Sequence, residues 1–212
     1  PSFLPLKTPL DEYKCRHGLG YTIFTSSLNS LEANLLCFVP LHEKCEVMKL
    51  MLKNNSNKKK TIRTVGAVEW CLWNALDDQT NFQRNYSTGE VEIDEKAIYH
   101  KTEYRERRNH FAFFSVNENV TSYDSDRATF LGRFNNYDNP DGIRRESLSF
   151  SRASGWSPIA ALENKFSLLP GEEKSLVYIL GYCENKDDEK WEKEGIINKT
   201  KAKALMERFS SP

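Results

Sequence analysis

The stretch from Trp70 to Asn117 carries the residue types that are needed to hold a sugar. It mixes aromatic rings with amides, carboxylates and guanidinium groups, in the order WCLWNALDDQTNFQRNYSTGEVEIDEKAIYHKTEYRERRNHFAFFSVN. Sugars offer flat C–H faces on which aromatic rings stack, and rims of hydroxyls that bond to Asn, Asp and Arg side chains. A purely structural interpretation stands beside this one, because alternating aromatic residues also form β cores and Arg–Glu pairs also form solvated surfaces.

Catalytic groups are less evident than binding groups. The sequence has no phosphate-binding loop, no dinucleotide-binding glycine pattern, no nucleophile elbow and no zinc-ligand spacing. Its nearest approach to a glycosidase pair is Asp77-Asp78 or Glu103 with Glu106, whereas such a pair needs carboxyl groups ~5–10 Å apart. Neighbouring carboxylates point in different directions, so we expect turn caps or hydroxyl contacts there. We predict no catalytic residue and, because the four histidines are dispersed, no metal site.

Composition limits the partners of the chain. The 30 basic and 30 acidic residues give a formal net charge of zero, so there is no broad basic field for nucleic acid. No apolar run approaches the ~20 residues of a membrane helix. Five scattered cysteines without a signal-peptide pattern indicate reduced thiols. We therefore expect a cytoplasmic protein without nucleic-acid or membrane partners.

The elements that must position these residues read as antiparallel strands. Alternation of apolar and polar residues predicts strands in the ranges 21–26, 31–39, 45–52 and 61–73, after an irregular segment over 1–19. The turn NNSNKKK predicts a hairpin between the last two strands. Further predicted strands are 90–93 paired with 97–100, the buried 110–116, and 158–168 paired with 175–182 around LLPGEE. This pattern is typical of an antiparallel β-sandwich.

Two segments interrupt the strand pattern. Residues 118–155 have few apolar anchors and read as a long loop, which we interpret as a subunit interface, a lid over the active site or a disordered segment. Its content of arginine and aromatic residues favours an interface. These residues are Arg127, Arg133, Arg144, Arg145, Tyr123, Phe134 and Tyr137. Residues 185–210 are charged and rich in helix formers, so we predict a helical linker over 185–212 after a β-sandwich domain over 1–184.

Several motifs of this chain resemble the amino-terminal domain of bacterial cellobiose phosphorylases, which belong to glycoside hydrolase family 94, formerly glycosyltransferase family 36. The motifs are WCLWNALDDQTNFQRN, STGEVEI, IYHKTEYRERRNH, SGWSPIA and LGYCEN, and the similarity runs from about Leu10 to about Phe209. The resemblance implies a large super-sandwich of the galactose mutarotase-like type that leads to an (α/α)6 catalytic barrel. It also implies a fragment, inactive alone, because roughly the first third of that domain would precede Pro1.

The same resemblance implies the activity of the parent protein. Enzymes of this kind are cytoplasmic, cofactor-free glycosyltransferases that convert a β-1,4-linked glucose disaccharide and inorganic phosphate into glucose 1-phosphate and glucose, with inversion. Their general acid lies in the barrel, and they are commonly homodimers. Close relatives use chitobiose or cellobionic acid, so the disaccharide stays open. The alternative is a stand-alone carbohydrate-binding module without catalysis.

The resemblance also assigns candidate contacts. Gln83 and Arg84 match a pair that contacts the leaving sugar, and Asn81 flanks it. The fixed fork of donors on Arg84 suits vicinal hydroxyls, although the arginine could instead pair with the acidic side chains at 77 and 78.

Other candidates in the matching motifs have two possible uses. Arg105, Arg107 and Arg108 line a cleft rim or, in the interpretation we prefer, fix the sandwich against the barrel or a partner subunit. Trp156 is a stacking platform or, as we prefer, a buried anchor.

Overall fold

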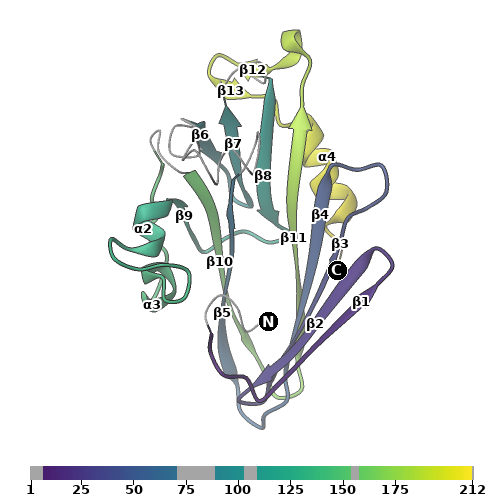
Figure 1. Ribbon diagram of the computed structural model, residues 1–212, viewed down its shortest axis with the longest axis vertical. Helices are drawn as coiled ribbons and strands as arrows, with labels where there is room; N and C mark the ends of the chain where they lie inside the picture. The colour runs from purple at the N-terminus through teal and green to yellow at the C-terminus, as the bar shows by residue number, and fades with distance from the viewer. Residues whose placement is uncertain (1–6, 71–88, 103–108, 154–157, 212) are drawn as a thin grey trace.

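The computed structural model describes residues 7–70, 89–102, 109–153 and 158–211. Within these residues the chain forms two facing antiparallel sheets, a two-stranded ribbon and a C-terminal helix (Figure 1). The prediction of a mainly β, antiparallel sandwich is confirmed.

The larger sheet has the strand order β1-β2-β3-β4-β11-β8-β7-β6. Its strands are β1 (Glu12–Gly18), β2 (Tyr21–Leu28), β3 (Leu31–Phe38), β4 (Cys45–Asn54), β6 (Gly89–Ile93), β7 (Ala97–Thr102), β8 (His110–Val116) and β11 (Glu173–Glu184). The expectation of an irregular segment over 1–19 was wrong for β1, which pairs with β2 along its whole length. As an edge strand it is exposed on both faces, so it shows no apolar alternation that a sequence pattern could reveal.

The smaller sheet has the order β5-β10-β9, with β5 (Lys60–Glu69), β10 (Pro158–Leu168) and β9 (Ser122–Asp126). Two predicted hairpins are wrong. Strand β4 pairs with β3 and β11 while β5 pairs with β10, and β10 and β11 lie in different sheets. Turn residues indicate that the chain reverses, but they do not indicate whether the next strand joins the same sheet or the facing one.

Asn54 bonds to both connections by which the chain passes between the two sheets, the one from β4 to β5 and the one from β10 to β11. Its side chain is 0% exposed, and Nδ2 donates to the carbonyls of Lys58 at 2.7 Å, Leu168 at 3.0 Å and Leu169 at 3.2 Å. Its Oδ1 accepts from the backbone N–H and the hydroxyl of Ser56. One amide therefore satisfies carbonyls of both connections at this end of the sandwich.

The large sheet buries side chains on both of its faces. Leu50 and Leu52 of β4 belong to the cluster between the two sheets, and Cys45 and Val47 belong to a second cluster on the outer face. The alternation of β4 was predicted, and it is confirmed.

The segment after β11 differs from the single helix expected over 185–210. It contains a 3-10 turn at Asp187–Glu189, the ribbon β12 (Trp191–Lys193) and β13 (Ile196–Ile197), and only then helix α4 (Thr200–Phe209). Gly195 takes a φ of 73° between the ribbon strands, which a helix excludes. Helix α4 packs on the outer cluster beside β11 (Figure 1), so its apolar face is used within this domain.

Residues 118–153, here called the excursion, are more ordered than the long loop predicted. They contain β9 and the short helices α2 (Arg127–Leu131) and α3 (Asp141–Arg144). Phe130, Leu131 and Leu148 form a third cluster with β10. The prediction of few apolar anchors was wrong, because Phe130 and Leu131 are adjacent while Leu148 lies much later in the chain, so the three show no period.

Candidate functional site

The sugar contacts and rim residues that the sequence predicts lie outside the described residues. They are Asn81, Gln83, Arg84, Arg105, Arg107, Arg108 and Trp156. The carboxylates at 77, 78, 103 and 106 fall in the same segments. The structure does define the strands that flank those segments.

The flanking strand ends lie at one end of the sandwich. Strand β5 ends at Glu69, which pairs with Ile159 at the start of β10. Trp70 packs against His100 with 5.7 Å between ring centroids, and this contact joins the end of β5 to β7. Strand β7 ends at Thr102, two residues after His100. Segments that are far apart in the sequence are thus attached to neighbouring strand ends, as a composite site requires.

A histidine is buried at this end of the sandwich. His100 is 2% exposed, and within the described part of the chain neither of its ring nitrogens nor Trp70 Nε1 has a hydrogen-bond partner. Burial lowers the pKa of His100 to about 3, so the ring is neutral near pH 7 and offers no positive charge to an anion. His100 is therefore a packed, neutral histidine.

The other described histidines are dispersed. His17 lies 3.0 Å from the Thr22 hydroxyl, whereas His110 contacts Tyr182 and lies 3.6 Å from Glu184. Across the described residues no three His, Cys, Asp or Glu side chains gather where they could hold a metal ion. The helices described here are also too short or too polar to span a bilayer.

A buried ion pair anchors the excursion to the smaller sheet. Glu163 on β10 is 0% exposed and lies 2.5 Å from the Arg63 guanidinium, which also donates to the carbonyls of Gly142 at 2.7 Å and Ile143 at 2.9 Å. Burial alone would raise the pKa of Glu163, but hydrogen bonds from Arg63 and Ser122 and the charge of Arg63 hold it below its ordinary value. The sequence does not mark Arg63 and Glu163 as partners, because both strands carry further charged residues.

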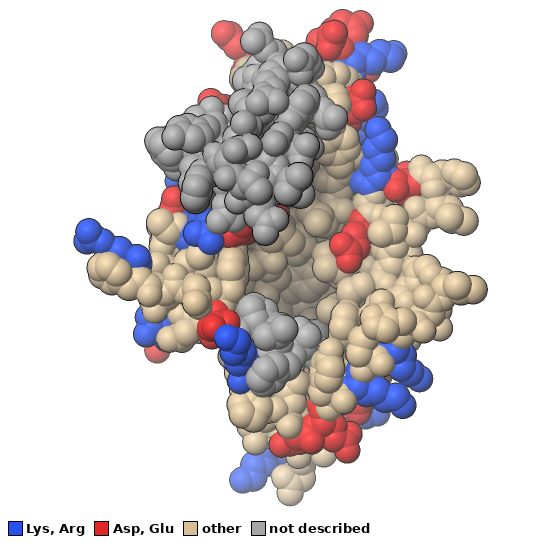
Figure 2. All heavy atoms as spheres, in the orientation of Figure 1, with Lys and Arg blue, Asp and Glu red and all other residues tan. Residues whose placement is uncertain are grey.

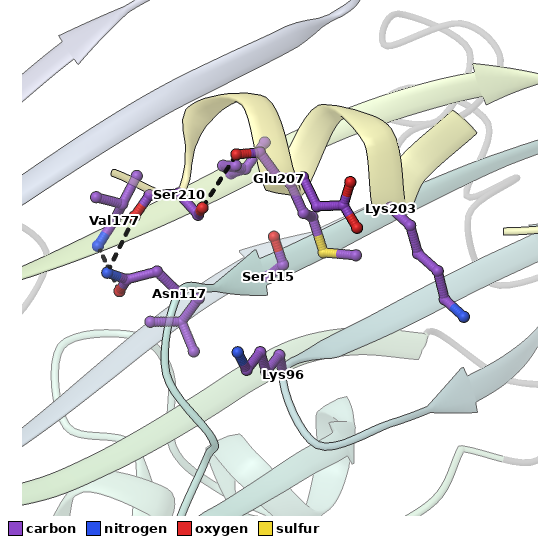
Figure 3. A pocket seen from close by; sticks show the side chains of 10 residues that line it. Lys96, Ser115, Asn117, Val177, Lys203, Glu207 and Ser210 are labelled. Atoms are coloured by element: carbon purple, nitrogen blue, oxygen red, sulfur yellow. Dashed lines mark hydrogen bonds between the residues drawn. The ribbon is translucent and has the colours of Figure 1, made fainter. Parts of the chain in front are cut away.

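A pocket of about 290 Å³ opens on the outer face of the large sheet, under α4. Lys203 and Glu207 extend from the helix, and Lys96 lies at the turn between β6 and β7 (Figure 3). Asn117 closes one end through a 3.3 Å hydrogen bond to the carbonyl of Ser210. The charged side chains here are exposed, and the fixed amide of Asn117 is already bonded to Ser210 and Val177, so this pocket offers a ligand few fixed polar groups.

The face in Figure 2 is hollowed near its centre. The visible floor of the hollow is uncharged, and Lys, Arg, Asp and Glu lie mainly around the outline. This distribution agrees with the net charge of zero and offers no single-signed field to a polyanion.

Comparison with known proteins identifies the class to which this two-sheet domain belongs. The model of the glycosyl hydrolase 94 supersandwich domain matches residues 1–212, so the chain belongs to this family. The resemblance drawn from the sequence motifs is confirmed.

Two of the named relatives are disaccharide phosphorylases. The N,N'-diacetylchitobiose phosphorylase of Vibrio proteolyticus is 31% identical over 189 residues, which cover 85% of this chain and 23% of that protein. The solabiose phosphorylase of Paenibacillus borealis is 28% identical over 173 residues, which cover 82% of this chain and 22% of that protein. The chain therefore spans less than a quarter of these relatives. Among solved structures, a heparan sulfate lyase from Pedobacter heparinus is 10% identical with a TM-score of 0.42, over 82% of this chain and 22% of the lyase.

Proposed function

We propose that the whole protein containing this chain is a cytoplasmic, cofactor-free disaccharide phosphorylase of the cellobiose phosphorylase type. Inorganic phosphate attacks the anomeric carbon of a β-1,4-linked disaccharide, while a general acid outside this chain protonates the leaving oxygen. The products are an α-linked sugar 1-phosphate and the free leaving sugar. The observation that carries the proposal is the match of residues 1–212 to the glycosyl hydrolase 94 supersandwich domain, together with the similarity to two named disaccharide phosphorylases.

Within that protein, this domain borders the active site and contacts the leaving sugar through Gln83, Arg84 and Asn81. The convergence of the flanking strand ends around Trp70 and His100 supports a composite site at that end of the sandwich. The guanidinium group of Arg84 bonds two vicinal hydroxyls without titrating.

The reaction is tested with purified whole protein, phosphate and either cellobiose or N,N'-diacetylchitobiose. Formation of the sugar 1-phosphate from one of them, in a strictly phosphate-dependent reaction, is the expected result. Release of monosaccharide at the same rate without phosphate contradicts the proposal. Arg84→Ala should raise KM for the disaccharide at least tenfold, while Arg16→Ala on the exposed edge strand β1 should leave it unchanged.

The whole protein is further proposed to be a homodimer to which the excursion contributes contacts. Sedimentation of the whole protein with and without residues 122–150 measures this. An unchanged dimer would assign the excursion to another role.

A further inference from the structure

Phe150 has a backbone conformation that a bulky residue rarely adopts. Its φ is 58°, in the left-handed region where glycine and asparagine are usual. The side chain is nevertheless 55% exposed, so the core gains little from this placement. A strained residue whose ring faces solvent indicates a purpose other than packing.

The strain is held in place by a buried carboxylate. Asp124 on β9 is 0% exposed, and its Oδ1 accepts hydrogen bonds from the backbone N–H of Ser149 at 3.0 Å and of Ser151 at 3.1 Å. The Ser151 hydroxyl donates to the same oxygen at 2.7 Å. Between these two residues, the Phe150 N–H donates to the carbonyl of Tyr123 at 2.8 Å. The backbone on both sides of Phe150 is therefore fixed, and this fixes the direction in which the side chain leaves the backbone.

The exposed ring lies beside β9, the edge strand of the smaller sheet (Figure 1), because Ser151 forms a bridge with Asp124 of that strand. Tyr123, which packs against the main core, meets Phe150 edge to face with centroids 5.2 Å apart and planes at 86°. Arg152 donates from Nε to the Tyr123 hydroxyl at 3.4 Å. In the described part of the chain, its other guanidinium donors have no hydrogen bond or ion pair. We call Tyr123, Phe150 and Arg152 the aromatic patch.

We propose that the aromatic patch is a carbohydrate subsite in which the C–H face of a pyranose ring stacks on Phe150. The guanidinium group of Arg152 donates hydrogen bonds to the hydroxyls at the rim of the same sugar ring. The patch thus offers both contacts that a sugar makes, stacking on its C–H face and hydrogen bonds to its hydroxyls. Pre-organisation of the ring by Asp124 lowers the ordering cost of a weak stacking contact. The inference rests on the proposed function, since it adds a sugar contact to a carbohydrate-active protein, and it assigns residues that the family motifs do not include.

The test measures binding of cellobiose, N,N'-diacetylchitobiose and cellotetraose to the whole protein by isothermal titration. Phe150→Ala should weaken binding of at least one of these sugars about tenfold, and Phe150→Tyr should retain it. Phe134→Ala is the matched control, because Phe134 is 89% exposed on the same excursion and has no positive φ; it should bind as the wild type does.

Phe150→Gly separates binding from folding, because glycine accepts the positive φ. It should raise Tm and weaken sugar binding together. Unchanged Kd for all three sugars in Phe150→Ala and Phe150→Gly, or no binding of any of them by the wild type, overturns the subsite. A changed oligomeric state with unchanged Kd overturns it in favour of a protein contact. If the whole protein shows no phosphorolysis but the Phe150 variants bind sugar more weakly, the proposed function fails and the subsite stands. If phosphorolysis is normal and the Phe150 variants bind sugar as the wild type does, the subsite alone fails.

Discussion

Arg63 lies 2.5 Å from a carboxylate oxygen of Glu163, and this carboxylate has no solvent exposure. Without Arg63 the buried carboxylate keeps only the half-exposed Lys165, at 3.3 Å, as a described cation, and breaking a buried pair costs ~3–5 kcal/mol. We expect Arg63→Met to lower the free energy of unfolding by about that amount, measured by urea denaturation. The double variant Arg63→Met/Glu163→Leu should recover most of the loss, since no charge is then left buried. A single variant as stable as the wild type would show that the pair is dispensable.

Asn54 should tolerate no change of its amide. Asn54→Asp replaces the donor to three carbonyls by an acceptor, so we expect a loss of roughly 3 kcal/mol or more in unfolding free energy. Its neighbour Asn55 is exposed, and among the described residues its side chain bonds only to Glu32, at 3.2 Å. Asn55→Asp is therefore the control and should change stability little. Equal effects of the two substitutions would contradict the role assigned to Asn54.

His100 makes stability depend on pH. Burial lowers its pKa to about 3, whereas the unfolded chain has an ordinary value near ~6.5. The unfolded chain alone binds this proton between those values, so stability is lost as pH falls below ~6.5, by about 2 kcal/mol at pH 5. His100→Leu removes this contribution and sacrifices no hydrogen bond. Unfolding free energies of both proteins at pH 7, 6 and 5 should diverge as pH falls; parallel curves would refute the prediction.

The described cysteines should differ in reactivity. Burial raises the pKa of Cys183 to about 12 and also raises that of Cys45, so both thiols carry little thiolate at pH 8. Cys15 is half-buried on the edge strand. Peptide mass spectrometry after iodoacetamide treatment should show Cys15 modified at least about tenfold faster than the other two, with equal rates in urea. Modification of Cys183 first would contradict this order.

Local periodicity predicted the strands better than their partners. The two faces of β4 and the buried strand β8 were predictable because alternation is a property of neighbouring residues. The choice of sheet for β5 and β11 was not predictable in this way, since it depends on pairings such as Glu163 with Val65 across about one hundred residues. The predicted extent of the C-terminal helix was wrong for a related reason. Trp191 pairs with Ile197 in a ribbon, but the charged helix formers in and around this ribbon resemble a helical sequence.

The candidate site was predictable only through the family motifs. Those motifs assign Gln83 and Arg84 as sugar contacts, and both residues lie outside the part of the chain that the structure describes. Asp124 and Phe150 have no motif, because an aspartate and an exposed phenylalanine are common residues. Only the backbone angle at Phe150 and the burial of Asp124 distinguish them.

Strand β11 has a consequence for synthesis on the ribosome. It pairs with β4 on one side and with β8 on the other, although its residues follow both strands in the chain. Until residues 173–184 emerge from the exit tunnel, strands β1–β4 and β6–β8 remain separate half-sheets, each with an open edge. Such edges are sites of misassembly between nascent chains, and closure of the sheet is a slow, non-local event. The growing domain is therefore most vulnerable just before β11 is translated.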